Sequence, residues 1–260
     1  MSRTPAKPAP KRNLREECVG AALAIIERNG VEALSLRDVA RQLGVSHQAP
    51  YKHFPSRDHI LAEVVARAFA GFAAHLDARP PGGDAQADLA AMGGAYLAFA
   101  AAHPLQYRLM FGTPLPDAAE HPAMMREARH AFSLLRDGLA RVAAERGAPA
   151  TEDALDRDAL YVWASMHGMA SIRASCAVDT LGLSPDVLAS AGRYGLARVS
   201  LALSAPVPAQ GLPHGAAAPA DPNIPAPRRP PNDGARPAPD RPVPARRARI
   251  RRPLASDDHG

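Results

Sequence analysis

Polar side chains that could contact a nucleic acid gather in one stretch of the sequence, SLRDVARQLGVSHQAPYKHF, residues 35–54. Ser35 and Ser46 each stand where a hydroxyl can accept a backbone N–H at the start of a helix. The second serine is followed by three residues in the first turn of a predicted helix: His47, Gln48 and Ala49. This order is typical of a helix-turn-helix, whose second helix enters the major groove of DNA.

Three elements would position these side chains. The apolar residues within 36–43 fall at helical spacing and would form one buried face. Gly44 follows where that helix must end and the chain must reverse. We expect the second helix over about residues 47–53, with Pro50 in or just past its first turn, where at most one intrahelical hydrogen bond is lost.

Apolar spacing in the rest of the folded region also predicts helices, and no stretch alternates apolar and polar residues as a strand would. We therefore expect an all-α fold, in which a three-helix head is joined by a fourth helix to a second helical domain. Outside the helix-turn-helix, the predicted helices span about residues 13–29, 56–78, 85–102, 105–111, 122–146, 153–178 and 184–203.

Composition divides the chain into four parts. Residues 1–12 form a basic arm and residues 205–260 a Pro/Arg-rich tail, and both lack the apolar content that offsets ordering entropy, so we expect them to be disordered. Between them we place a helix-turn-helix domain over residues 13–78 and a helical domain over residues 79–204. The net charge of +5 lies at the two ends, which suits contact with DNA or, equally, a solubilising role.

Several classes of protein are disfavoured by the sequence. No run of 18 apolar residues predicts a membrane span, and the basic N-terminus is not followed by the apolar segment of a secretory signal. The two cysteines, Cys18 and Cys176, are far apart and read as buried small apolar residues in a reducing cytosol. We expect a cytoplasmic protein.

Catalytic motifs are missing from the sequence. It holds no glycine-rich phosphate loop and no GxSxG, and its histidines do not form an i, i+4 metal pair with a third ligand. We therefore expect no enzymatic activity, no cofactor and no bound metal.

Residues 1–75 resemble the TetR/AcrR family of bacterial transcriptional repressors. The resemblance is carried by ALAIIERNGVEALSLRDVA, by the turn LGVS, by Tyr51-Lys52-His53-Phe54, and by SRDHIL. The later region is similar to the WHG-type ligand domain behind some TetR-like heads. That similarity is carried by Trp163, His167 and Gly168 in YVWASMHGMASI, and by HPLQYRLMFG.

The resemblance implies a role for each polar residue of the head. The residues at the positions of His47, Gln48 and Ala49 face base edges, and Arg37 can reach a base. Gln can bond adenine in two places, Arg can bond guanine, and an alanine methyl can meet the thymine methyl. The implied phosphate-binding residues are Ser35, Tyr51, Lys52, His53 and Arg57, and Ser46 is also expected among the DNA-binding residues.

Plainer interpretations of these residues stay open. Pro50 departs from the family, where a less constrained residue is common. Tyr51 could simply pack against the first helix, and Phe54 reads as core. Arg37 and Arg41 flank an aspartate, which also suits a solvated helix face with weak ion pairs.

For the whole protein, the resemblance implies a dimeric repressor on a pseudo-palindromic, double-stranded operator at the nucleoid. The dimer would form through the last two helices, which are rich in small residues, and a small apolar effector would release the DNA. The implied pocket walls are Tyr96, Phe99, Met110, Phe111, Met125, Phe132, Trp163 and His167. Plain core packing, a structural hydrogen-bonded role for His167, and a DNA-binding regulator or architectural protein without an effector remain the alternatives.

Overall fold

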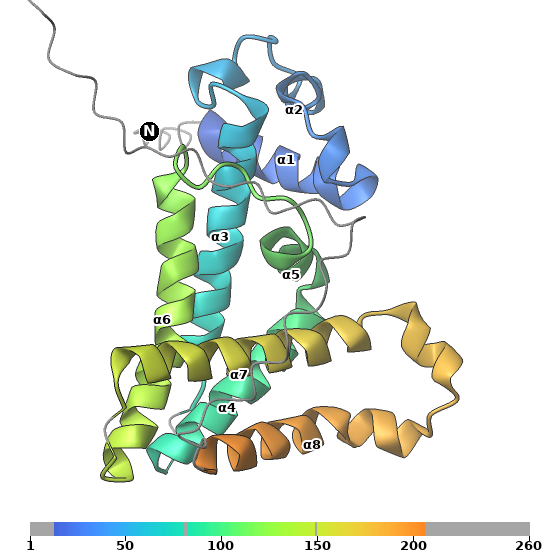
Figure 1. Cartoon of the computed structure of the whole chain (residues 1–260). Coiled ribbons are helices and arrows are strands. Elements are labelled where there is room, and N and C mark those ends of the chain that lie inside the picture. The colour runs from blue at the N-terminus through green and yellow to red at the C-terminus, as the bar shows by residue number, and fades with distance from the viewer. Residues whose placement is uncertain (1–12, 81–82, 149, 206–260) are drawn as a thin grey trace, which may run out of the picture. The chain divides into compact units, whose positions relative to one another are not determined.

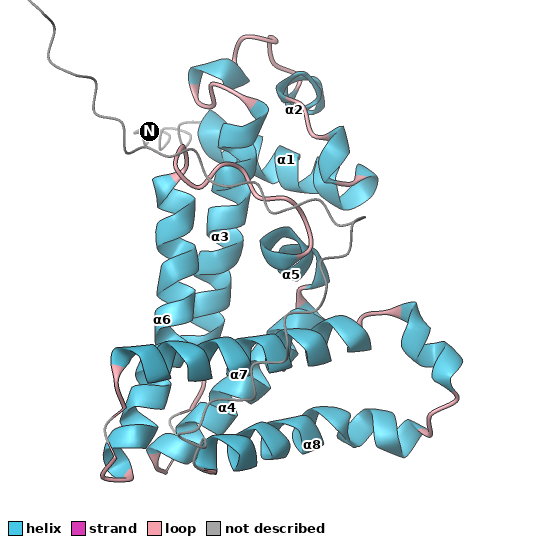
Figure 2. Cartoon of the chain, viewed as in Figure 1, coloured by secondary structure: helices cyan, strands magenta, loops and turns pink. Residues whose placement is uncertain are grey.

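The structure, a computed structural model, describes residues 13–80, 83–148 and 150–205. Throughout these residues the chain forms helices and no strand (Figure 1, Figure 2). The all-α prediction is confirmed. The predicted disordered arm and almost all of the predicted tail lie outside the described residues.

Eight α-helices follow one another in the described chain. They are α1 (Leu14–Asn29), α2 (Leu36–Leu43), α3 (Arg57–Asp77), α4 (Ala85–Ala102), α5 (Pro104–Phe111), α6 (Pro122–Glu145), α7 (Glu152–Arg173) and α8 (Pro185–Ser204). Three 3₁₀-helices join them: η1 (Val31–Ala33), η2 (Pro50–Lys52) and η3 (Cys176–Leu181).

Side-chain caps explain where most of the helices begin. An oxygen of the residue before the helix accepts the backbone N–H three positions later, which satisfies one of the unpaired donors of the first turn. The capping residues found in this role are Asn13, Ser35, Ser56, Asp84, Thr151 and Ser184. These bonds form within four residues of sequence, so the helix starts could be predicted well.

The prediction of an α-helix over residues 47–53 is wrong. The segment consists of turns and the 3₁₀-helix η2. Pro50 has no N–H with which to bond the carbonyl of Ser46, and the N–H of Ala49 bonds that carbonyl instead, at 2.9 Å. The chain then continues with i→i+3 bonds, such as that from the N–H of His53 to the carbonyl of Pro50 at 2.9 Å.

The helix predicted over residues 153–178 is also too long. The α-helix ends at Arg173, and the chain tightens into i→i+3 bonds, beginning with the N–H of Ser175 on the carbonyl of Ile172 at 3.0 Å. The 3₁₀-helix η3 follows, and Gly182 then takes a positive φ of 64° that turns the chain toward α8.

Helix α3 is the structural centre of the described chain. It packs on α1 in the head and on α4, α5 and α6 beyond it. By length and composition alone it could cross a membrane, with a mean hydropathy of 1.2. Its apolar side chains are instead core residues, among them Ile60, Val65 and Phe72.

Helices α4 and α8 approach each other at Gly93. A Cβ at this position would lie 2.3 Å from Cδ2 of Leu196, closer than any real contact. Two adjacent glycines inside a helix, such as Gly93 and Gly94, can mark either a kink or a close approach of another helix. Because α4 continues unbroken through both, Gly93 marks a close approach.

Candidate nucleic-acid interface and internal cavity

The turn of the helix-turn-helix is built around Gly44. Gly44 has a φ of 65°, in the left-handed region that glycine adopts without strain. Its N–H and that of Val45 bond carbonyls in the last turn of α2, with Val45 donating to Ala40 at 3.1 Å. This ends α2 and reverses the chain, so the next segment passes across the head.

The three residues predicted to face base edges lie on this reversed segment. His47 and Gln48 are exposed, and Ala49 is half-buried. Directly after them, Pro50 and Phe54 are buried and hold the segment to the core. The structure therefore presents two polar side chains to solvent on a segment anchored from behind.

The predicted phosphate-binding residues separate into two groups. Tyr51, Lys52 and His53 are exposed on η2 and the residue after it. Ser35 and Arg57 are engaged within the protein. The Ser35 hydroxyl donates to Asp38 at 2.6 Å, and an Arg57 Nη donates to the carbonyl of Val31 at 2.9 Å.

The arginines of α2 differ in the same way. Arg41 pairs with Asp38 at 2.5 Å. Arg37 is exposed and has no hydrogen bond or ion pair with the described residues. Arg37 and Lys52 are therefore the side chains on α2 and η2 whose positive charge is available to an external anion.

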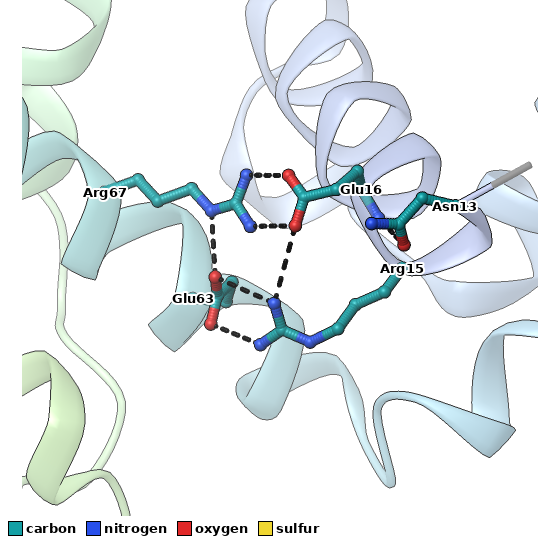
Figure 3. Close-up of polar contacts among 5 residues, drawn as sticks. All are labelled: Asn13, Arg15, Glu16, Glu63 and Arg67. Atoms are coloured by element: carbon teal, nitrogen blue, oxygen red, sulfur yellow. Dashed lines mark hydrogen bonds and ion pairs between the residues drawn. The ribbon is translucent and has the colours of Figure 1, made fainter. Parts of the chain in front are cut away.

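A cluster of four charged side chains joins α1 to α3 (Figure 3). Arg67 donates to both oxygens of Glu16, at 2.6 and 2.7 Å, and to Glu63 at 2.8 Å. Arg15 donates to Glu63 at 2.7 and 3.2 Å. Because each carboxylate accepts from an arginine of the other helix, the cluster sets how α1 lies on α3.

The arginines change the acidity of both carboxylates. The hydrogen bond from Arg67 lowers the pKa of Glu16 below its ordinary value. Burial by itself would raise the pKa of Glu63, but the hydrogen bonds from Arg15 and Arg67 outweigh it, and the pKa of Glu63 is lowered. Both acids are therefore charged at neutral pH.

Below the head, a cavity of about 380 Å³ lies among α3, α4, α6, α7 and α8, with α5 at one side. This volume is in the range of small-molecule sites. Its walls are mainly aromatic, methionine and aliphatic side chains. Of the residues predicted to line an effector pocket, those found in the wall are Tyr96, Met110, Phe111, Met125, Phe132 and Trp163.

Two of the predicted pocket residues, Phe99 and His167, do not line this cavity. Phe99 is buried on α4, one turn after Tyr96, and its ring packs on Phe72, His75 and His103. His167 bonds the Tyr107 hydroxyl through Nδ1 at 2.7 Å. The family resemblance implied a place for both in the pocket wall, but it does not show which neighbour stands between them and the cavity.

A chain of hydrogen bonds leads from the cavity wall to α7. The Tyr96 hydroxyl shares a hydrogen bond of 2.9 Å with Tyr107, which in turn bonds His167, and His167 Nε2 lies 3.3 Å from the Ser171 hydroxyl. Burial, followed by the bond to Tyr107, raises the pKa of Tyr96 above its ordinary value. The Tyr96 hydroxyl is thus neutral and already has a partner.

Sequence reasoning missed part of the wall. Gln86 at the start of α4, Arg129 on α6, and Leu196 and Ser200 on α8 all line the cavity. Arg129 lies at i+4 from Met125, which was predicted to line the pocket, so helical spacing could have placed both on one face. Its charge suggested a solvated position instead.

Large apolar side chains are exposed along the outer faces of α7 and α8. Val187, Tyr194 and Leu201 are 51%, 67% and 61% exposed and stand seven residues apart on α8. On α7, Leu160, Tyr161 and Ile172 are 54%, 47% and 61% exposed. A spacing of seven keeps side chains close to one helix face, so α8 presents an apolar stripe to solvent.

A helix-turn-helix head joined by α3 to an all-helical body with an internal cavity defines a class of bacterial regulatory protein. The family profile described as bacterial regulatory proteins, tetR family, matches residues 19–64, and that described as tetracyclin repressor-like, C-terminal domain, matches residues 89–193. The chain belongs to the TetR family.

Curated relatives and solved structures agree with this assignment. The HTH-type transcriptional regulator Mb1846 of Mycobacterium bovis is 28% identical over 113 residues, 41% of this chain and 48% of the relative. The repressor KstR of Mycolicibacterium smegmatis is 34% identical over 67 residues, 26% of this chain and 33% of that protein. The match therefore spans at most about half the length of these relatives.

A solved structure extends the similarity beyond the head. A protein of unknown function from Rhodococcus sp. RHA1 is 29% identical, with a TM-score of 0.57, over 75% of this chain and all of that one. The described fold, head and body together, is thus shared with a known structure.

Proposed function

We propose that the chain is a DNA-binding transcriptional regulator, a dimeric repressor that a small apolar effector releases from its operator. One observation carries the proposal: α3 belongs to both the head and the cavity wall. Its first residue, Arg57, bonds the carbonyl of Val31 in the head, and Phe69, Phe72 and Leu76 further along it line the cavity.

The head supplies the contact with DNA. Gln48 and His47 are exposed on a segment anchored by buried neighbours, and Lys52 and Arg37 lie exposed on either side of the turn. Amide and guanidinium groups bond base edges, and lysine and tyrosine suit phosphate oxygens. Three relatives are named as repressors, which favours repression as the direction of control.

The outer faces of α7 and α8 supply the dimer contact. Exposed large apolar residues on adjacent helices are typical of a surface that another protein covers. A second copy of the chain related by a two-fold axis would place two heads on successive major grooves of a pseudo-palindromic site. Such a regulator acts in the cytoplasm, at the nucleoid.

Helix α3 links ligand binding to DNA binding. A ligand in the cavity would contact Phe69, Phe72 and Leu76, and it would favour whichever packing of α3 against α4 and α6 fits it best. Because the head is bonded to the start of α3, that packing sets the spacing of the two heads. A ligand that stabilises the wrong spacing lowers the affinity for DNA.

Selection of bound sequences from random DNA by the purified full-length protein tests the proposal. We expect a two-fold symmetric site, bound by a dimer. Recovery of no preferred sequence would overturn DNA-specific regulation. If a site is found, and every compound that binds the cavity leaves DNA affinity unchanged, the chain is a regulator without an effector, and the release mechanism fails.

A further inference from the structure

One charged side chain lines the mainly apolar cavity. Arg129 on α6 is exposed and, within the described chain, makes no hydrogen bond or ion pair. Other arginines of α6 are paired: Arg126 with Glu127, Arg136 with two acids of α7, and Arg141 with Asp88. Arg129 therefore offers a positive charge to whatever the cavity holds.

The remaining polar groups of the wall already have partners. The Gln86 amide donates to the Ser200 hydroxyl at 2.5 Å and accepts from Arg146 at 2.6 Å. The Tyr96 hydroxyl is bonded to Tyr107. A ligand with one polar end would consequently find its unsatisfied partner at Arg129 and apolar contacts along the rest of the wall.

Arg129 and Gln86 mark two distant parts of the cavity. Arg129 lies one turn after Met125, near the start of α6, whereas Gln86 is bonded to Arg146, the residue that follows α6. The cavity wall runs from Met125 to Leu135 on α6 and from Gln86 to Tyr96 on α4, and each of these stretches covers about 15 Å at 1.5 Å per residue. A volume of about 380 Å³ spread over such a length fits an extended molecule rather than a compact one.

We propose that the cavity binds an extended apolar molecule with one terminal anionic group, such as a carboxylate, and that Arg129 holds that group. A guanidinium bonds a carboxylate in two places and keeps its charge at any physiological pH. The apolar chain would lie along the wall formed by α3, α4 and α8, toward Gln86. The inference rests on the proposed function, because it takes this cavity as the effector site.

Fluorescence of a tryptophan in the cavity wall can report the binding of a ligand. Trp163 is the one tryptophan of the chain and lines the cavity, with its ring 5.9 Å from that of Phe111 and 6.0 Å from that of Phe132. The full-length protein would be titrated at neutral pH with linear carboxylates from octanoate to hexadecanoate and with the alcohols of the same lengths. Tryptophan fluorescence and titration calorimetry would report binding.

We expect at least one carboxylate to bind about tenfold or more tightly than its alcohol, because a hydrogen bond to a charged group is worth about 1.5–3 kcal/mol. Arg129→Gln should remove this preference and keep the affinity for the alcohol. Arg129→Lys should retain part of it. Arg126→Gln, an exposed and paired arginine on the same helix, is the matched control and should behave as the unmodified protein.

Equal affinity for acid and alcohol, a preference that survives Arg129→Gln, or no binding of either series would overturn the inference. Release of the selected DNA is measured in parallel and separates the two proposals. Carboxylate binding through Arg129 without DNA release would support this inference and overturn effector control. Release by alcohols and carboxylates alike would support effector control and overturn the role of Arg129.

Discussion

Arg67 on α3 and Glu16 on α1 are joined by two hydrogen bonds, of 2.6 and 2.7 Å, one to each carboxylate oxygen. The two residues are far apart in sequence, and their pairing ties the first helix of the head to the helix that enters the body. Glu63 and Arg15 extend the contact on the same side.

Acid should weaken this contact. Glu16 and Glu63 have a lowered pKa in the folded chain, so their stabilising contribution is present above the unfolded-state value of 4.5 and is lost as the pH falls through the folded-state pKa. At pH values below about 4.5, the midpoint temperature of thermal unfolding should decrease as the pH is lowered. This decrease should be less steep in Arg67→Met than in the unmodified protein. Parallel pH profiles for the two proteins would contradict the prediction.

Gly93→Ala and Gly94→Ala should have opposite effects on stability. A Cβ at residue 93 would lie 2.3 Å from Leu196, whereas nothing lies within 4 Å of one at residue 94. We expect Gly93→Ala to lose about 1–3 kcal/mol through overpacking, and Gly94→Ala to gain up to about 1 kcal/mol from helix propensity. Urea unfolding measures both, and equal gains would show that α8 moves aside without cost.

Lys52→Ala and Gln48→Ala should separate the two kinds of DNA contact. Lys52→Ala should weaken binding to all sequences and reduce the slope of log affinity against log salt by about one. Gln48→Ala should relax the preference at one base position, at a cost of about 1–3 kcal/mol. Arg157→Ala, which removes an exposed arginine of α7, is the control. An unchanged salt slope in Lys52→Ala would place Lys52 away from the phosphates.

Tyr194→Glu combined with Leu201→Glu should yield monomers. Both side chains are more than half exposed on the apolar stripe of α8, and two charges per copy would have to be buried without partners in the dimer. Sedimentation velocity over a range of concentrations measures the assembly, and circular dichroism checks that the helices remain. Arg126→Glu on α6 is the control. A double variant that remains dimeric would place the contact elsewhere.

Most helix boundaries and the family assignment follow from the sequence alone, because their signals are local. Ser35, Ser56 and Ser184 cap their helices through bonds that close within four residues. Gly44 ends α2 by its own backbone conformation. Apolar spacing then shows which face of each helix is buried.

Only the tertiary structure determines which residues pack against those faces. The sequence could not show that the Arg57 guanidinium is engaged within the head, since it bonds a carbonyl 26 residues away. Nor could it show that Phe99 and His167 do not line the cavity whereas Arg129 does. Six helices contribute to the cavity wall, and the packing between them determines which residues line it. Periodicity within one helix does not encode that packing.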